Sequence, residues 1–164
     1  APLDIVVPRK IGAPGNEEFA IGAITESGEG IFDKGSLQYW GVSKEYIDET
    51  VKKEQAEAKR RIKVYRGKKK AISLKSKTVI LLDDGIATGS TMRAAIKSVR
   101  VSGAKKLVVA VPVMPADRVK AFEKLVDELV YLDAPVDFAA VGQFYQYFSQ
   151  TTDKEVVEIM KKFN

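Results

Sequence analysis

Short apolar runs alternate with stretches of helical periodicity along most of this chain, and this alternation limits the fold more than any other feature. The runs Thr78–Leu82, Leu107–Val113 and Leu129–Leu132 have the length and composition of strands, and we expect the first of them to be buried. Amphipathic segments separate them, one beginning after Gly89 and the other at about Asp117. Because strands that alternate with helices form parallel sheets, we expect an α/β fold with a mainly parallel sheet and helices on both faces.

Helix signals elsewhere extend this prediction. Ser43 is an expected N-cap, and the apolar positions that follow it recur at helical spacing to about Tyr65. Gly67 and the lysines 68–70 are then expected to form a loop. Near the end of the sequence, Thr152-Asp-Lys-Glu155 is a capping box that predicts a terminal helix.

The N-terminal region is less regular. Leu3–Val7 is a mostly apolar run, which we interpret as a buried strand. Gly12–Asn16 is a turn cluster, after which we expect a short helix to begin at Glu17. Two further apolar pieces, Ile21–Thr25 and Ile31–Phe32, are expected to pair as a hairpin around the glycines between them.

The absence of two residue types limits the chemistry. The 164 residues, which suit one domain spanning 1–164, include no cysteine and no histidine. Disulfides, thiolate nucleophiles, Ser-His-Asp triads and zinc sites built from cysteine or histidine are therefore excluded. Carboxylates, lysines, hydroxyls and backbone amides remain, together with hard cations such as Mg²⁺.

The strongest local signal follows the predicted strand Thr78–Leu82. Asp83 and Asp84 come next, and a glycine-containing loop then leads into a helix. Backbone N–H groups at a helix start attract anions, and Gly89 permits close approach of a ligand. Three hydroxyl donors surround this glycine: Thr88, Ser90 and Thr91. Such a loop can hold a phosphate, while the adjacent acids suit neutral hydroxyls or Mg²⁺, so the pattern predicts a site for ribose 5-phosphate.

Other phosphate-binding motifs are absent from the sequence. Neither the P-loop pattern nor the dinucleotide fingerprint G-x-G-x-x-G occurs. Taken alone, Thr88-Gly-Ser-Thr91 would be typical of an ordinary helix N-terminal turn. The strand and the two acids that precede it favour a ligand site instead.

The segment from Asp83 to Thr91 resembles the phosphoribosyl-pyrophosphate signature of the type I phosphoribosyltransferases. The resemblance implies that Asp83 and Asp84 are catalytic residues that contact the ribose hydroxyls. It implies that the following positions bind the 5-phosphate: Ala87, Thr88, Gly89, Ser90 and Thr91. Members that act on 6-oxopurines have an aspartate where this sequence has Ala87, so it is more similar to the adenine and orotate types.

The same resemblance implies an activity and its partners. The reaction would transfer a 5-phosphoribosyl group between phosphoribosyl pyrophosphate and a nitrogenous base in nucleotide salvage or synthesis. Mg²⁺ would be bound through the substrate, with Asp83 or Asp84 in contact through water. The family also suggests a homodimer.

Most of the chain is similar to one branch of the family, often called predicted phosphoribosyltransferases. The matching pieces include residues 1–7, Arg9–Asn16, Tyr65-Arg-Gly67 and Val141–Tyr145. That branch usually begins earlier, with another strand and a Pro-Arg-Gly-Gly loop that resembles the pyrophosphate loop of the family. This sequence shows neither, so if it is complete we expect one strand fewer and weaker pyrophosphate binding.

Three groups of residues are expected to support the site. Arg9 and Lys10 follow the first predicted strand and are interpreted as substrate-binding cations for pyrophosphate, although a plain surface loop would look the same. Arg60, Arg61 and Arg66, with the lysines 68–70, lie near the mobile loop of the family. An aromatic cluster near the last strand resembles the hood that covers the base, with core packing as the alternative for some members: Phe138, Phe144, Tyr145 and Phe148.

Charge is unevenly distributed and leaves a second function open. Residues 52–77 hold twelve basic and two acidic residues, while the whole chain has a net charge of +5. The alternative is therefore a non-catalytic regulator that senses phosphoribosyl pyrophosphate or a nucleotide and binds nucleic acid. We expect nucleic-acid binding less than catalysis, because the segment has few aromatics and no helix-turn-helix pattern. No run approaches the roughly 18 apolar residues of a membrane span, and no signal segment opens the chain, so a cytoplasmic location is expected.

Overall fold

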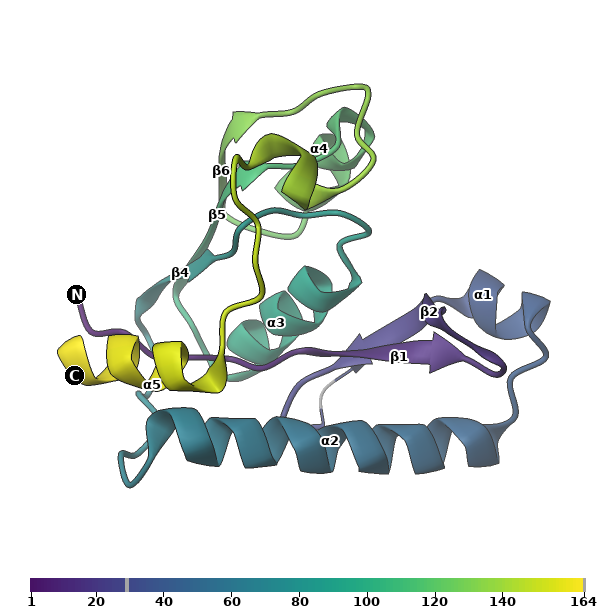
Figure 1. Ribbon diagram of the computed structural model, residues 1–164, viewed down its shortest axis with the longest axis horizontal. Coiled ribbons are helices and arrows are strands. Elements are labelled where there is room, and N and C mark those ends of the chain that lie inside the picture. Colours follow the sequence, from purple (N-terminus) through teal and green to yellow (C-terminus); the bar gives the residue numbers. More distant parts are fainter. Residues whose placement is uncertain (29, 164) are drawn as a thin grey trace. The chain divides into compact units, whose positions relative to one another are not determined.

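A computed structural model describes residues 1–28 and 30–163. The helices and strands follow in this order: β1 Arg9–Ala13, β2 Asn16–Ile24, β3 Gly30–Phe32, α1 Lys34–Tyr39, α2 Lys44–Arg66, β4 Thr78–Leu82, α3 Ser90–Val101, β5 Lys106–Val113, α4 Ala116–Glu123, β6 Glu128–Asp133, the short 3-10 helix η1 Val141–Phe144, and α5 Asp153–Lys162 (Figure 1). The predicted α/β fold with a parallel sheet is confirmed.

The chain divides into two compact units, each built from separate segments. Unit 1 comprises residues 1–72, 90–98 and 151–164, and unit 2 comprises residues 73–89 and 99–150. We describe each unit by itself. That residues 1–164 act as one domain stays a prediction.

Unit 1 contains an antiparallel sheet of order β1-β2-β3 whose apolar face packs on α2 (Figure 1). A tight turn joins β1 to β2, and β2 pairs with β3 through Gly22–Phe32 and Ile24–Gly30, as the predicted hairpin requires. The fully buried residues Ile11, Ile21 and Ile24 form the centre of this core. Partly buried side chains surround it: Phe32, Leu37, Trp40, Val42, Tyr46 and Val51.

The long helix of unit 1 begins and ends as its sequence predicts. The side chain of Ser43 accepts a hydrogen bond from the backbone N–H of Tyr46 at the start of α2, and Gly67 at the end has a φ of 63°. The C-terminal helix α5 has the complete predicted capping box between Thr152 and Glu155. The hydroxyl of Tyr65 on α2 donates a hydrogen bond to Asp153, so α5 is tied to the last turns of α2.

Two predictions for the N-terminal region are wrong. Leu3–Val7 is not a strand. The side chain of Asp4 accepts hydrogen bonds from the backbone N–H groups of Ile5 and Ile72, and these bonds take the place of hydrogen bonds to a neighbouring strand. The short helix expected from Glu17 is instead the start of β2. Gly15, with a φ of 73°, turns the chain back, and the residues that follow pair with β1.

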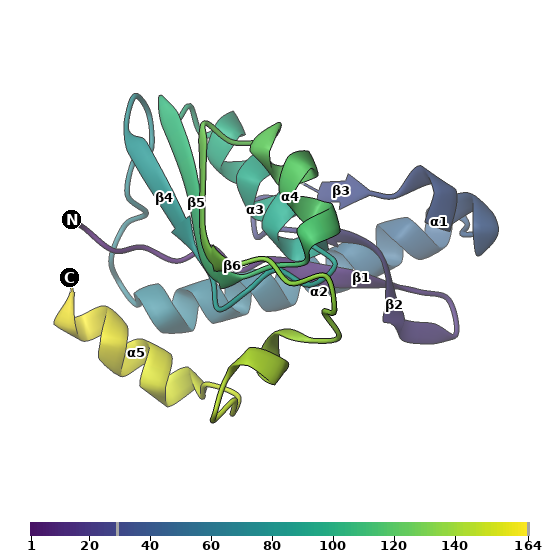
Figure 2. The ribbon, with the colours of Figure 1, turned by 90° about the horizontal axis from the view of Figure 1, so that it is seen from above.

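Unit 2 is built on a parallel sheet of order β4-β5-β6, with α4 beside it (Figure 2). All three predicted strands are present. Phe122 of α4 and Leu107, Val109 and Val113 of β5 are among its fully buried side chains.

One face of this sheet remains apolar and open. The strand register places Leu82, Ala110 and Val130 side by side on the same face. Ile80, Leu82, Val130 and Leu132 are 58%, 71%, 44% and 86% exposed. The prediction that Thr78–Leu82 is buried is therefore wrong for most of its residues, because β4 is an edge strand with only Leu81 fully covered.

Candidate functional site

The acidic pair lies where the sequence predicts, at the carboxyl end of a parallel strand. β4 ends at Leu82, and the exposed residues Asp83 and Asp84 follow directly. The backbone N–H of Asp84 donates a hydrogen bond of 3.0 Å to the side chain of Asp83. In α/β sheets this edge is where ligands bind, so both carboxylates are available to a small molecule.

The two carboxylates have different surroundings. Partial burial of the carboxylate raises the pKa of Asp83, and the neighbouring charge of Asp84 acts in the same direction. The hydrogen bond from the Asp84 N–H lowers this pKa and offsets part of the shift. Asp83 consequently binds a proton more readily than an ordinary aspartate does.

The loop that follows, residues 83–89, is closely packed within unit 2, and we call it the site loop. Ile86 is 2% exposed, and its backbone N–H donates to the carbonyl of Val113 at the end of β5 (3.0 Å). A Cβ added to Gly85 would lie 2.7 Å from the side chain of Val141. Gly89 has a φ of 81°, and a Cβ there would lie 2.7 Å from the ring of Phe122. Both glycines are therefore required by close packing, the second also by its backbone angle.

The exposed part of the loop carries the predicted phosphate-binding positions. Ala87 and Thr88 are exposed between the buried residues Ile86 and Gly89, and Ser90 begins α3, with Thr91 in its first turn. The first N–H groups of a helix have no partner within the helix and carry the positive end of its dipole. This stretch can accept an anion through backbone N–H groups and hydroxyls.

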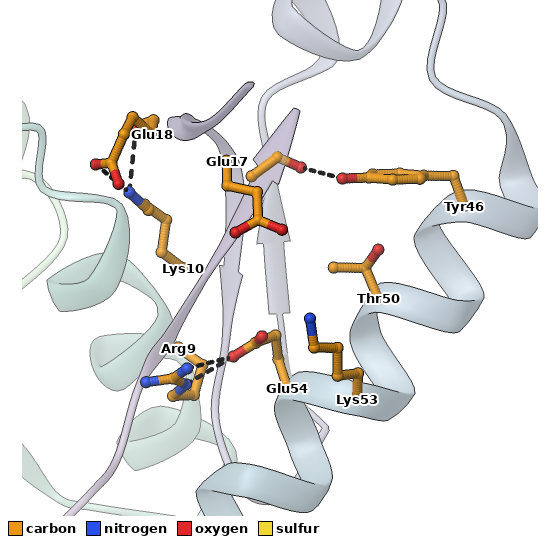
Figure 3. Close-up of a pocket in the computed structure, with 9 residues that line it drawn as sticks. Arg9, Lys10, Glu17, Glu18, Tyr46, Thr50, Lys53 and Glu54 are labelled. Atoms are coloured by element: carbon orange, nitrogen blue, oxygen red, sulfur yellow. Dashed lines mark hydrogen bonds and ion pairs between the residues drawn. The ribbon is translucent and has the colours of Figure 1, made fainter. Parts of the chain in front are cut away.

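Arg9 and Lys10 lie in unit 1, at the start of β1, and line a pocket of about 360 Å³ between the β1–β2 hairpin and α2 (Figure 3). Arg9 forms an ion pair with Glu54 at 2.7 Å, and Lys10 forms one with Glu18 at 3.2 Å. Each cation is already balanced by a carboxylate. That Arg9 and Lys10 face the same ligand as Asp83 and Asp84 stays a prediction.

Residues 52–77, which we call the basic segment, contain arginines that are paired as well. Glu57 pairs with both Arg60 and Arg61 on α2, which lowers the pKa of Glu57 to about 2. Arg66 pairs with Asp4 at 2.9 Å. The lysines at positions 68–70 follow α2 and are exposed. The Arg66–Asp4 pair thus joins two separate segments of unit 1, whereas the Glu57 pairs lie within α2.

Sequence reasoning missed one connection at the site. The aromatic cluster lies on residues 138–148 of unit 2, which we call the aromatic segment, with ring pairs Phe138–Phe144 and Tyr145–Phe148 at 5.3 Å each. The hydroxyl of Tyr145 donates a hydrogen bond of 2.7 Å to the backbone carbonyl of Asp84. No local pattern signals this bond, because its partners are 61 residues apart in the chain.

The described residues supply no complete metal site and no membrane span. Among them, no group of three or more His, Cys, Asp or Glu side chains could hold a metal ion. None of the helices in the described part of the chain is long and apolar enough to cross a bilayer.

A parallel α/β sheet with an acidic pair and a close-packed glycine loop at the end of a strand is an arrangement that can bind an anionic ligand. The chain matches the model of the phosphoribosyl transferase domain over residues 1–147, and it belongs to this family.

Two curated Mycobacterium tuberculosis proteins with provisional phosphoribosyl transferase names are similar to it: MT0597 of strain CDC 1551 / Oshkosh and Rv0571c of strain ATCC 25618 / H37Rv. Each is 40% identical over 162 residues, which cover 99% of this chain and 37% of the relative, so the chain spans little more than a third of their length. The crystal structure of TT1426 from Thermus thermophilus is also similar, with a TM-score of 0.79 and 38% identity over 99% of this chain and 76% of that chain.

Proposed function

We propose that this chain binds phosphoribosyl pyrophosphate at the site loop and transfers its 5-phosphoribosyl group to a nitrogenous base, or catalyses the reverse reaction. One observation carries the proposal: Asp83 and Asp84 are followed directly by a close-packed loop that leads into the first turn of α3. Membership of the phosphoribosyl transferase family supports it.

The phosphate and the sugar would bind to different parts of this segment. Backbone N–H groups and hydroxyls between Ala87 and Thr91 receive the 5-phosphate. Asp83 and Asp84 accept hydrogen bonds from the two ribose hydroxyls and stabilise positive charge that develops on the sugar as the bond to pyrophosphate breaks. The tight packing at Gly85 and Gly89 supports this role, because a fixed loop needs no rearrangement when the charge develops.

Mg²⁺ fits this donor set only as an ion shared with the substrate. Mg²⁺ is commonly bound by one or two carboxylates, with waters and substrate phosphates completing the shell. Asp83 and Asp84 offer two carboxylates, the first of them partly buried, and no third Asp, Glu, His or Cys among the described residues joins them. When bound, the ion would neutralise the charge of the leaving pyrophosphate.

Arg9 and Lys10 are proposed to bind pyrophosphate after exchange of partners. Both already contact a glutamate, so a pyrophosphate would have to replace Glu54 or Glu18. The Lys10–Glu18 pair is the easier one to exchange, because the side chain of Glu18 is 96% exposed and that of Glu54 is 14% exposed.

Isotope exchange tests the proposed reaction. Labelled pyrophosphate is incubated with phosphoribosyl pyrophosphate, Mg²⁺ and a panel of bases or their nucleotides. Turnover with one base is expected, and Asp84→Asn should reduce it by about 10²-fold or more because a charge contact to the transition state is lost. Asp48→Asn, an exposed aspartate on α2, is the matched control and should leave the rate unchanged. Absence of exchange with every base would reject catalysis.

One observation favours a second function, a regulator that binds nucleic acid. In unit 1 the lysines of the basic segment are exposed, whereas its arginines are paired. These lysines are Lys52, Lys53, Lys59, Lys63, Lys68, Lys69 and Lys70. A regulator would bind phosphoribosyl pyrophosphate without turnover, and its affinity for nucleic acid would fall steeply with salt concentration.

A further inference from the structure

The site loop and the aromatic segment are joined by one directed hydrogen bond within unit 2. The Tyr145 hydroxyl donates to the carbonyl of Asp84, the residue whose side chain is proposed to hold the ribose. At 2.7 Å this is a bond of normal length for a hydroxyl donor. It restrains the backbone of Asp84 through a residue that lies 61 positions further along the chain, whereas β4 fixes the chain just before Asp83.

A second contact from the same segment restrains the next residue. The side chain of Val141, the first residue of η1, fills the space where a Cβ of Gly85 would lie, at 2.7 Å. The turn that contains Val141 and Tyr145 is itself closed by a hydrogen bond from the Tyr145 N–H to the Gly142 carbonyl at 3.3 Å. Asp84 and Gly85 are therefore contacted by one compact turn.

Tyr145 also connects this turn to the aromatic rings. The ring of Tyr145 packs against Phe148 at 5.3 Å, and a Cβ on Gly142 would lie 2.8 Å from the Phe148 ring. Movement of Phe148 would thus act on the turn that holds Asp84. The partial exposure of Phe144 and Phe148, 37% and 52%, leaves these rings accessible to a planar ligand.

We propose that Tyr145 is a positioning residue that fixes Asp84 for the ribose and couples the aromatic segment to the sugar site. The inference rests on the proposed function, since it assigns the purpose of the bond. It makes binding of a planar base at the aromatic segment and binding of the sugar at Asp84 depend on each other through one hydroxyl.

Tyr145→Phe tests the proposal, because it removes the hydroxyl and keeps the ring that packs on Phe148. Tyr147→Phe is the matched control, since Tyr147 is two residues away and 86% exposed. In the ligand-free protein, amide hydrogen exchange in residues 84–86 is expected to become about threefold to tenfold faster in Tyr145→Phe, and to stay unchanged in Tyr147→Phe. Exchange in β5 should be the same in both variants and confirms that each is folded.

Ligand binding gives the second measurement. Calorimetry with phosphoribosyl pyrophosphate and Mg²⁺ is expected to show about threefold to tenfold weaker binding to Tyr145→Phe than to Tyr147→Phe. In combination with Asp84→Asn, the effect of Tyr145→Phe should shrink, because the hydroxyl acts through Asp84. Val141→Ala, which loosens the same turn from the side of Gly85, should also speed exchange in residues 84–86.

The outcomes separate this inference from the proposed function. Equal exchange rates in Tyr145→Phe and Tyr147→Phe would overturn the restraint, and equal affinities or full additivity with Asp84→Asn would overturn the positioning role. A wild-type protein that binds neither phosphoribosyl pyrophosphate nor any nucleoside monophosphate would reject the proposed function and with it the positioning role, while the exchange data would still decide whether Tyr145 restrains the loop.

Discussion

Asp83 and Asp84 are adjacent and chemically identical, but their surroundings differ. Partial burial, with the charge of Asp84 nearby, raises the pKa of Asp83, whereas the carbonyl of Asp84 is held by Tyr145. An acid whose pKa is raised by folding binds more protons in the folded state than in the unfolded state. The ionised form of Asp83 therefore lowers the stability of the fold, as is common for groups retained for ligand binding.

Asp83→Asn should stabilise the folded protein and weaken its binding of the proposed ligand. The favourable contribution of protonated Asp83 is present below the unfolded pKa, near 3.8, and is lost as the pH rises through the higher folded pKa. The variant should therefore have a higher Tm than the wild type at pH 7, and the difference should disappear below about pH 3.8. Thermal unfolding at several pH values measures this, and a lower Tm for Asp83→Asn at pH 7 would contradict it.

Gly89→Ala should lower the free energy of unfolding by more than a Gly→Ala substitution at a position with open space around it. The φ of 81° is strained for alanine, and the new Cβ would overlap the buried ring of Phe122. We expect a loss of about 1–3 kcal/mol in the free energy of unfolding, or more if the ring cannot move. Gly15→Ala is the control, because its φ of 73° gives similar backbone strain while nothing lies within 4 Å of the added Cβ. Equal losses in the free energy of unfolding for the two variants, measured with urea, would show that the overlap with Phe122 adds no further destabilisation.

At the scale of elements, α2 is held by polar contacts as well as by the core of unit 1. It has a side-chain N-cap at Ser43, and an ion pair joins its last residue, Arg66, to Asp4. Ala58 is its one fully buried residue. The stability of this helix in acid should therefore depend in part on charge, including the two arginines that pair with Glu57.

Glu57→Gln should reduce the loss of stability in acid. Hydrogen bonds from Arg60, and then from Arg61, lower the pKa of Glu57 from 4.5 to about 2. A lowered folded pKa gives stability that is present above the unfolded value and is lost as the pH falls through the folded value, here between about 4.5 and 2. Far-UV circular dichroism across this range should show a shallower decline of Tm in the variant. The effect at neutral pH should be small, because the pair is exposed to solvent. An unchanged slope would show that the bonds are absent in solution.

The sequence predicted elements whose signals are local. The strands of unit 2, the caps at Ser43 and Thr152, and the acidic pair after β4 each depend on a few neighbouring residues, and all lie where they were expected. Leu3–Val7 was misassigned because an apolar run looks the same whether it pairs in a sheet or packs as an extended segment held by Asp4. The bond between Tyr145 and Asp84 could not be predicted, since it depends on the folding of the whole of unit 2.

At the scale of the molecule, the open face of the parallel sheet should make this 164-residue chain associate with itself. Contiguous apolar surface on an edge strand favours self-association, and Ile80 and Leu82 combine both features. We expect strong binding of a hydrophobic dye and a sedimentation coefficient that rises with concentration. Leu82→Lys should reduce both, whereas Val64→Lys, at an exposed position on α2, should not. Equal behaviour of the two variants would exclude this face as the cause.

The division of unit 1 into three segments has a consequence for how the protein is made. All residues of unit 2 leave the ribosome before Thr151, whereas unit 1 also includes α5, whose Asp153 accepts a hydrogen bond from the Tyr65 hydroxyl. During synthesis the parallel sheet and its loop can therefore be complete while the N-terminal half still waits for α5. Residues 1–72 are translated before unit 2 and thus complete their contacts after it.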